Sequence, residues 1–157
     1  MNYTEIERKF LINDLTFMKE SFDSHLIEQG YLNSNKNRSV RVRIKNNQGF
    51  LTIKGSSNKS GTTRFEWEKK ISIDEATRLL AICEPGAIRK TRYLVKYKHH
   101  TFEVDVFEGD NKGLIVGEIE LSSEKESFEK PKWLGEEVTG DIKYYNSQLS
   151  KNPYKNW

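Results

Sequence analysis

Charged and apolar residues alternate with a period of two through most of this chain of 157 residues. In the first segment, the charged residues Glu5, Glu7 and Lys9 stand at odd-numbered positions, and the apolar residues Ile6 and Phe10 stand at even-numbered positions. Successive side chains of a β-strand point to opposite faces, so the three charged residues would share one face and the apolar residues the other. The pattern therefore predicts half-buried strands rather than amphipathic helices.

This alternation, together with turn-forming residues, predicts a mainly β (α+β) protein. We expect strands near residues 3–12, 25–33, 38–46, 49–56, 61–73, 87–98, 100–108 and 114–123. We expect helices over 74–81, 123–130 and 144–149, and a short helical turn between residues 13 and 21. About eight strands with tight hairpins are typical of an antiparallel barrel or a strongly curved sheet, and the length favours a single domain over 1–157.

Overall charge excludes several classes of partner. The chain has 26 basic and 23 acidic residues, a net charge of +3, so bulk attraction to nucleic acid or membranes is weak.

Cys83 is the single cysteine, which leaves no internal disulfide and too few thiolates for a cysteine-based zinc site. No apolar stretch approaches a membrane span, and the charged N-terminus lacks the apolar region of a signal peptide. We expect a cytoplasmic protein without nucleic-acid or membrane partners.

Like charges two residues apart recur along the predicted strands. The basic pairs are Arg41/Arg43 and Lys90/Arg92; the acidic pairs besides Glu5/Glu7 are Glu66/Glu68, Glu103/Asp105 and Glu118/Glu120. Separation of the two signs on different strands costs repulsion if nothing binds there. In a closed barrel, these faces would line a lumen with a basic and an acidic wall, which suits a polyanion that carries a divalent metal. The alternative is a half-open sheet whose polar face is solvated.

The same residues resemble the CYTH domain, the family of triphosphate tunnel metalloenzymes. The resemblance begins with the Glu-x-Glu-x-Lys signature at residues 5–9. It continues in order through most of the chain, as Gln29-Gly30-Tyr31-Leu32, Arg41-Val42-Arg43, Thr52-Ile53-Lys54, Lys90-Thr91-Arg92-Tyr93, Glu103-Val104-Asp105, Glu118-Ile119-Glu120 and the segment 133–139. We expect no appended helical domain, and in this respect the chain resembles the short bacterial-type members of the family.

The resemblance implies a closed eight-stranded antiparallel tunnel with flanking helices, a triphosphate substrate, and Mg²⁺ or Mn²⁺. The implied metal ligands are Glu5, Glu7, Glu103, Asp105, Glu118 and Glu120. The implied phosphate-binding residues are Arg41, Arg43, Lys54, Arg64, Lys90 and Arg92. Lys9 is expected to position or deprotonate the attacking water, or else to form a plain ion pair. Tyr31 is expected to bind Lys9 or phosphate, or else to fill the barrel.

Several functions remain open on the sequence alone. The first is hydrolysis of inorganic tripolyphosphate to pyrophosphate and phosphate, which needs only phosphate recognition. The others are cyclisation of ATP to cyclic AMP, hydrolysis of thiamine triphosphate, and a non-enzymatic polyphosphate-binding module. Paired metal-binding carboxylates argue against the last, because storage of a polyanion needs cations alone. Apolar outer faces make a homodimer plausible, and the polar loop 55–61 is a candidate lid.

Overall fold

The computed structural model describes residues 2–157, of which about half form strands. The strands are β1 (Thr4–Ile12), β2 (Asp23–Asn33), β3 (Arg38–Lys45), β4 (Gln48–Ser57), β5 (Thr63–Ile71), β6 (Ile88–Tyr97), β7 (His100–Phe107), β8 (Ile115–Glu120) and β9 (Leu134–Glu137). The helices are α1 (Phe17–Glu20), α2 (Ile73–Ala81) and α3 (Asn146–Leu149), with 3₁₀ turns η1 (Gly109–Asn111), η2 (Ile142–Tyr144) and η3 (Tyr154–Asn156).

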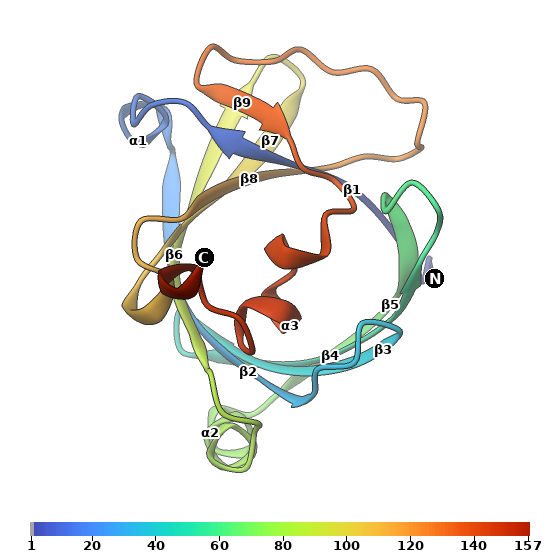
Figure 1. Cartoon of the computed structure of the whole chain (residues 1–157), viewed down its shortest axis with the longest axis vertical. Helices are drawn as coiled ribbons and strands as arrows, with labels where there is room; N and C mark the ends of the chain where they lie inside the picture. The colour runs from blue at the N-terminus through green and yellow to red at the C-terminus, as the bar shows by residue number, and fades with distance from the viewer. Residues whose placement is uncertain (1) are drawn as a thin grey trace.

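Strand β1 closes the sheet into a barrel, seen end-on in Figure 1. The strand order is β5-β4-β3-β2-β6-β7-β8-β1, and every pairing is antiparallel. One edge of β1 pairs with β8, while the other pairs first with β5, over Thr4–Ile6, and then with β9. The predicted closed eight-stranded antiparallel barrel is confirmed, and β9 is an additional strand that the sequence pattern did not indicate.

Turns and caps mostly follow the predicted chemistry. Asn46 and Asn47 take positive φ angles of 46° and 67° in the β3–β4 hairpin, a conformation that asparagine tolerates well. Helix α2 begins after Ser72, which forms a reciprocal capping box with Glu75. The prediction of a helix over 123–130 is wrong. That segment is irregular, because the Glu124 side chain bonds the β4–β5 loop instead of supporting a helix.

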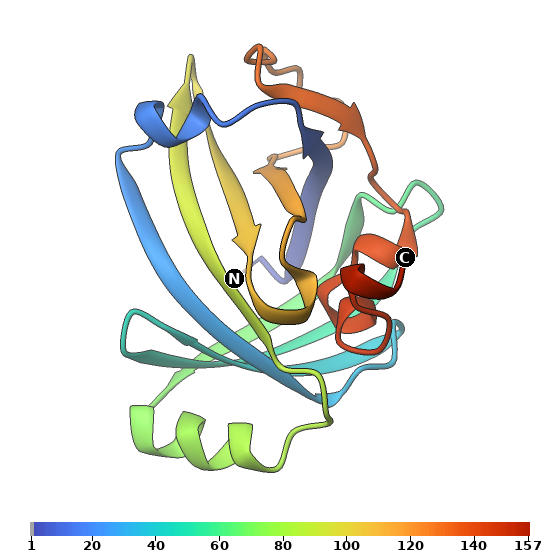
Figure 2. The same cartoon turned by 60° about the vertical axis from the view of Figure 1, so that its left-hand side comes forward.

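The outward face of half the barrel carries the main hydrophobic core. Phe10, Phe102 and Val104 are fully buried there, and Phe17 of α1 and Trp133 before β9 pack over them. Figure 2 shows α2 lying along a different part of the barrel wall, beneath β2–β4. The apolar residues therefore pack outward, and the inward positions are left to charged side chains.

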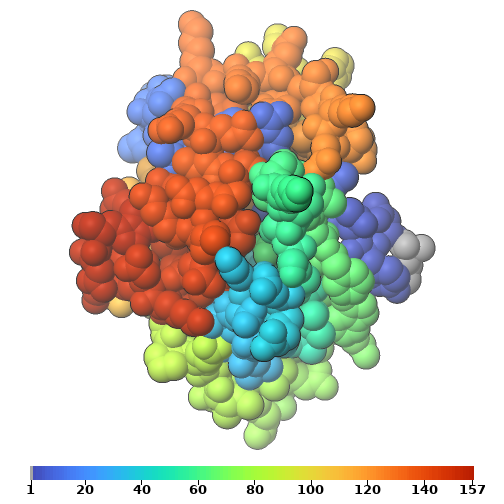
Figure 3. Space-filling model, turned by 45° about the vertical axis from the view of Figure 1, so that its right-hand side comes forward, coloured from blue at the N-terminus to red at the C-terminus, as the bar shows by residue number. Residues whose placement is uncertain are grey.

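The C-terminal segment lies inside the ring of strands. Figure 1 shows η2 and α3 within the ring of strands, and the turned view in Figure 2 shows that they lie at one end of the barrel. Leu149 of α3 is fully buried against Ile88 and Phe107 of the wall. Figure 3 shows this segment, in orange and red, beside the β2–β3 and β4–β5 loops in cyan and green. The predicted helix over 144–149 is thus a helix over 146–149 that narrows the lumen.

Within residues 2–157, no helix has the length and apolar character needed to cross a membrane. On the outer side of β4 and β5, Ile53 and Phe65 remain exposed. Homodimer formation through such a face stays a prediction.

Candidate functional site

The barrel brings most of the predicted site residues around one cavity of about 40 Å³. Inward positions alternate along each strand, which is why the period-two pattern located them. The cavity is lined by Glu7, Lys9, Tyr31, Ser39, Arg41, Arg43, Lys54, Arg64, Lys90, Arg92, Glu118, Tyr145, Asn146 and Ser147. The remaining predicted residues, Glu5, Glu103, Asp105 and Glu120, are joined to this set by ion pairs or by strand register.

Carboxylates gather where β1 meets β8. Glu7 lies directly opposite Glu120, and Lys9 lies opposite Glu118. The pKa of Glu7 is raised to about 8. Burial is the largest cause, followed by the nearby carboxylates of Glu118 and Glu5. Burial and the nearby acidic side chains also raise the pKa of Glu120. This corner of the lumen therefore opposes ionisation of Glu7.

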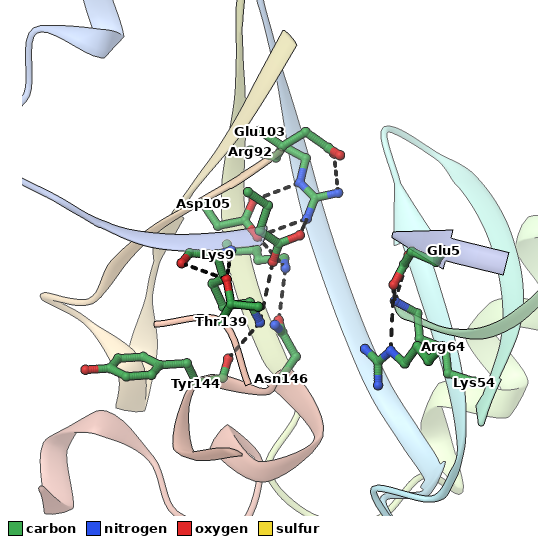
Figure 4. A network of polar contacts seen from close by, with 12 residues as sticks. Glu5, Lys9, Lys54, Arg64, Arg92, Glu103, Asp105, Thr139, Tyr144 and Asn146 are labelled. Carbon is green, nitrogen blue, oxygen red and sulfur yellow. Dashed lines mark hydrogen bonds and ion pairs between the residues drawn. The ribbon is translucent and has the colours of Figure 1, made fainter. Parts of the chain in front are cut away.

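Lys54 crosses from β4 to the carboxylates of two other strands. Its Nζ lies 2.8 and 3.0 Å from the two oxygens of Glu5 and 3.2 Å from Glu66. Arg64 approaches Glu5 from the other side, at 3.7 Å, because β1 and β5 pair at these residues (Figure 4). Burial alone would raise the pKa of Glu5, but Lys54, hydrogen bonds and Arg64 lower it to about 2.

Asp105 organises the basic residues of β6. One of its oxygens accepts from Lys90 Nζ at 2.7 Å, and the other accepts from Arg92 Nε at 2.8 Å. The guanidinium of Arg92 also reaches Glu103 at 2.6 Å (Figure 4). Burial would raise the pKa of Asp105, but Arg92 and Lys90 hold it below its usual value. The structure therefore places Asp105, a predicted metal ligand, between two cations.

Two arginines of β3 keep few close partners: Arg41 reaches the carboxylate of Glu68 only at 3.6 Å, and Arg43 contacts a neutral side chain. Arg43 donates from Nε to the neutral side chain of Gln29 at 2.8 Å, and Arg41 Nε is buried without a hydrogen-bond partner. Burial, Arg41 and Arg92 lower the pKa of Arg43 to about 9. An unpaired buried donor is costly unless a ligand satisfies it. This wall is therefore suited to bind an anion with planar, paired donors.

The C-terminal segment adds polar groups that the sequence pattern missed. Lys9 Nζ donates to the Tyr144 carbonyl at 3.2 Å, as Figure 4 shows. The Asn146 side-chain oxygen accepts from Lys90 at 2.9 Å and from Gln29 at 3.0 Å. The Tyr145 ring lies 5.4 Å from Lys9 Nζ. These residues are uncharged and follow no strand alternation, so only their position inside the barrel identifies them.

The donor chemistry of the lumen fits a hard divalent cation, since the acidic wall offers only carboxylate oxygens. Such an ion would favour the ionised form of Glu7, which burial and the neighbouring carboxylates oppose. Among residues 2–157, however, no three carboxylate, histidine or cysteine side chains stand together as a metal-holding group. The acidic side chains Glu5 and Glu118 face Lys54 and Lys9 instead.

Comparison with known proteins gives one family. The model of the CYTH domain matches residues 3–151. An inorganic triphosphatase of Acetivibrio thermocellus is 46% identical over 154 residues, covering 98% of this chain and 97% of its own. An inorganic triphosphatase of Nitrosomonas europaea is 36% identical over 151 residues, covering 94% and 97%. The crystal structure of the inorganic triphosphatase NE1496 superposes with a TM-score of 0.67 at 33% identity, covering 93% of each chain.

Proposed function

Because this chain belongs to the CYTH domain family, we propose that it is an inorganic triphosphatase, which hydrolyses tripolyphosphate to pyrophosphate and phosphate. The similarity covers 97% of the length of both curated relatives.

One observation carries the proposal: the lumen has a basic wall and an acidic wall that face one cavity. Arg41 and Arg43 lie on the basic wall, where Arg43 contacts neutral Gln29 and Arg41 has Glu68 at 3.6 Å, while Glu7 and Glu120 oppose each other on the acidic wall. A triphosphate with a bound cation has the complementary arrangement of charge. The cavity lining is mostly charged, which favours a substrate recognised through its phosphates alone.

A divalent cation, Mg²⁺ or Mn²⁺, belongs to this proposal. Glu5, Glu7, Glu118 and Glu120 would hold it, and when bound it supplies charge neutralisation at phosphate oxygens and a lowered pKa of bound water.

The protein's own residues bind and orient the phosphates. Arg41 and Arg43 offer paired donors to non-bridging oxygens, and their positive charge favours departure of the terminal phosphoryl group. Asp105 fixes Lys90 and Arg92, both of which line the cavity. Lys9 is placed beside Glu118 and the Tyr144 carbonyl, where it can hold a water or a phosphate oxygen.

The test is phosphate release from tripolyphosphate, ATP and thiamine triphosphate, each with Mg²⁺, Mn²⁺ or EDTA. We expect metal-dependent release from tripolyphosphate, and a loss of about 100-fold or more in Glu7→Gln. Glu28→Gln, which changes an exposed glutamate of β2, is the matched control. Cyclic AMP formed from ATP would instead indicate a cyclase. Preference for thiamine triphosphate would change the substrate, and metal-independent binding without turnover would indicate a polyphosphate-binding module.

A further inference from the structure

Lys54 occupies a position between two carboxylates of different strands. Its ammonium contacts both oxygens of Glu5 on β1 and one oxygen of Glu66 on β5. Lys54 and Glu5 are each only 9% exposed, so water screens the contact little. Glu5 is a predicted metal ligand, whereas Glu66 is not. One ammonium therefore neutralises the carboxylate that a metal would need and has a second carboxylate within reach.

Lys9, the lysine of the Glu-x-Glu-x-Lys signature, likewise faces a carboxylate that is a predicted metal ligand. Lys9 Nζ lies 3.7 Å from Glu118 and also donates to the Tyr144 carbonyl. In the described part of the chain, no three acidic side chains form a metal-holding group, and two of the acidic side chains at the site contact lysines. The donor chemistry is suitable, but ammonium groups already contact two of the carboxylates that would hold the cation.

The inference rests on the proposed function and goes beyond it. We propose that Lys54 is an internal counter-ion that exchanges between Glu5 and Glu66. It pairs with Glu5 until a divalent cation takes that carboxylate, and it then stays on Glu66. Glu66 is accordingly a positioning residue that acts through Lys54.

Glu66 makes the exchange energetically feasible. A buried ammonium that loses its partner would carry a large desolvation cost. Because Glu66 already lies 3.2 Å from Nζ, Lys54 keeps one carboxylate when Glu5 turns to the cation. The donors that pointed at Glu5 then become available to phosphate oxygens. Binding of the cation and binding of triphosphate should therefore assist each other, and this coupling is reciprocal.

The first test measures Mn²⁺ binding by calorimetry without any triphosphate. Lys54→Met should bind Mn²⁺ about tenfold more tightly than the natural protein, because the competing ammonium is gone. Arg43→Met is the matched control, since it removes a lumen cation that contacts neutral Gln29. We expect a change of less than about threefold there. Equal tightening in both variants would show a general charge effect, and no tightening in Lys54→Met would overturn the proposal.

The second test asks whether Glu66 acts through Lys54, by a double-mutant cycle. Glu66→Gln should weaken Mn²⁺ binding about fivefold in the natural background, because Lys54 then pairs with Glu5 alone. The same change should have little effect in the Lys54→Met background. Glu68→Gln is the control, because Glu68 lies two residues further along β5 and faces Arg41. Equal losses from Glu66→Gln in both backgrounds would show a direct action on the cation and overturn its positioning role.

These measurements separate the inference from the function on which it rests. If tripolyphosphate is hydrolysed but Lys54→Met leaves Mn²⁺ affinity unchanged, only the exchange of Lys54 is wrong. If Mn²⁺ binding follows the expected pattern without hydrolysis, the exchange stands and the triphosphatase proposal fails. If Mn²⁺ binds to none of the variants, the exchange of Lys54 is wrong, and phosphate release alone decides the triphosphatase proposal. Circular dichroism and thermal unfolding of each variant verify that the barrel is folded.

Discussion

Glu7 of β1 lies directly opposite Glu120 of β8 in the antiparallel pairing. Side chains in that relationship have Cβ atoms about 5 Å apart, where like charges destabilise a sheet. The pKa of Glu7 is raised to about 8, first by burial and then by Glu118 and Glu5. The fold therefore holds a carboxylate where its charged form is unfavourable, an arrangement that bound cations relieve.

The first prediction concerns pH. A carboxyl whose pKa is higher in the folded than in the unfolded protein binds a proton more tightly when folded, so its effect on stability worsens as pH rises. For Glu7, the penalty should grow between about pH 4.5 and pH 8. Glu7→Gln should remove it, with a gain on the order of 3 kcal/mol at pH 8 over the natural protein and little gain at pH 5. Urea unfolding at both pH values measures the difference. A gain independent of pH would contradict the assignment.

The second prediction concerns Asp105, which is 1% exposed and pairs with Lys90 and Arg92. Asp105→Asn should lower the free energy of unfolding by about 3–5 kcal/mol, because two buried cations lose their counter-ion. Asp110→Asn is the matched control, since it breaks the exposed pair with Lys155 and should cost less than about 1 kcal/mol. Similar losses in both variants would show that Asp105 is not needed to hold the cations.

The sequence predicted the barrel and its charged lumen because both follow from a local pattern. Alternation along each strand fixes which side chains face inward, so Arg41, Arg43 and the Glu-x-Glu-x-Lys residues were located without any tertiary information. Which inward residues contact each other depends on strand order and register. The contact between Glu5 and Arg64 exists only because β1 closes the barrel against β5.

Other features had no local signal. Strand β9 has four residues and exists because the second half of β1 has a free edge for it. Asn146 belongs to the site because the C-terminal segment lies inside the barrel, where its side chain meets Lys90. The segment 123–130 has the composition of a helix, but contacts of Glu124 with the β4–β5 loop override that propensity.

The third prediction concerns that loop, which was a candidate lid. Glu124 accepts hydrogen bonds from the side chains of Asn58, Ser60, Thr62 and Thr63, so the loop is tied to the segment after β8. Glu124→Ala should speed amide hydrogen exchange about tenfold or more at Asn58 and Gly61, whose amides close the turn. Lys125→Ala, at the adjacent exposed position, should leave those amides unchanged. Unchanged exchange in Glu124→Ala would show that the loop holds its shape without this tie.

The fourth prediction concerns the basic wall. Arg43 binds neutral Gln29, and Arg41 Nε has no partner, so both guanidinium groups have donors for phosphate. Arg43→Lys keeps the charge but loses the planar pair of donors, and we expect KM for tripolyphosphate to rise about tenfold or more. Arg38→Lys makes the same change at an exposed position of β3 and should leave KM unaltered. If Arg43→Lys behaves like Arg38→Lys, the wall acts through net charge alone. A fall in kcat without a change in KM would instead place Arg43 at the phosphoryl group as it departs.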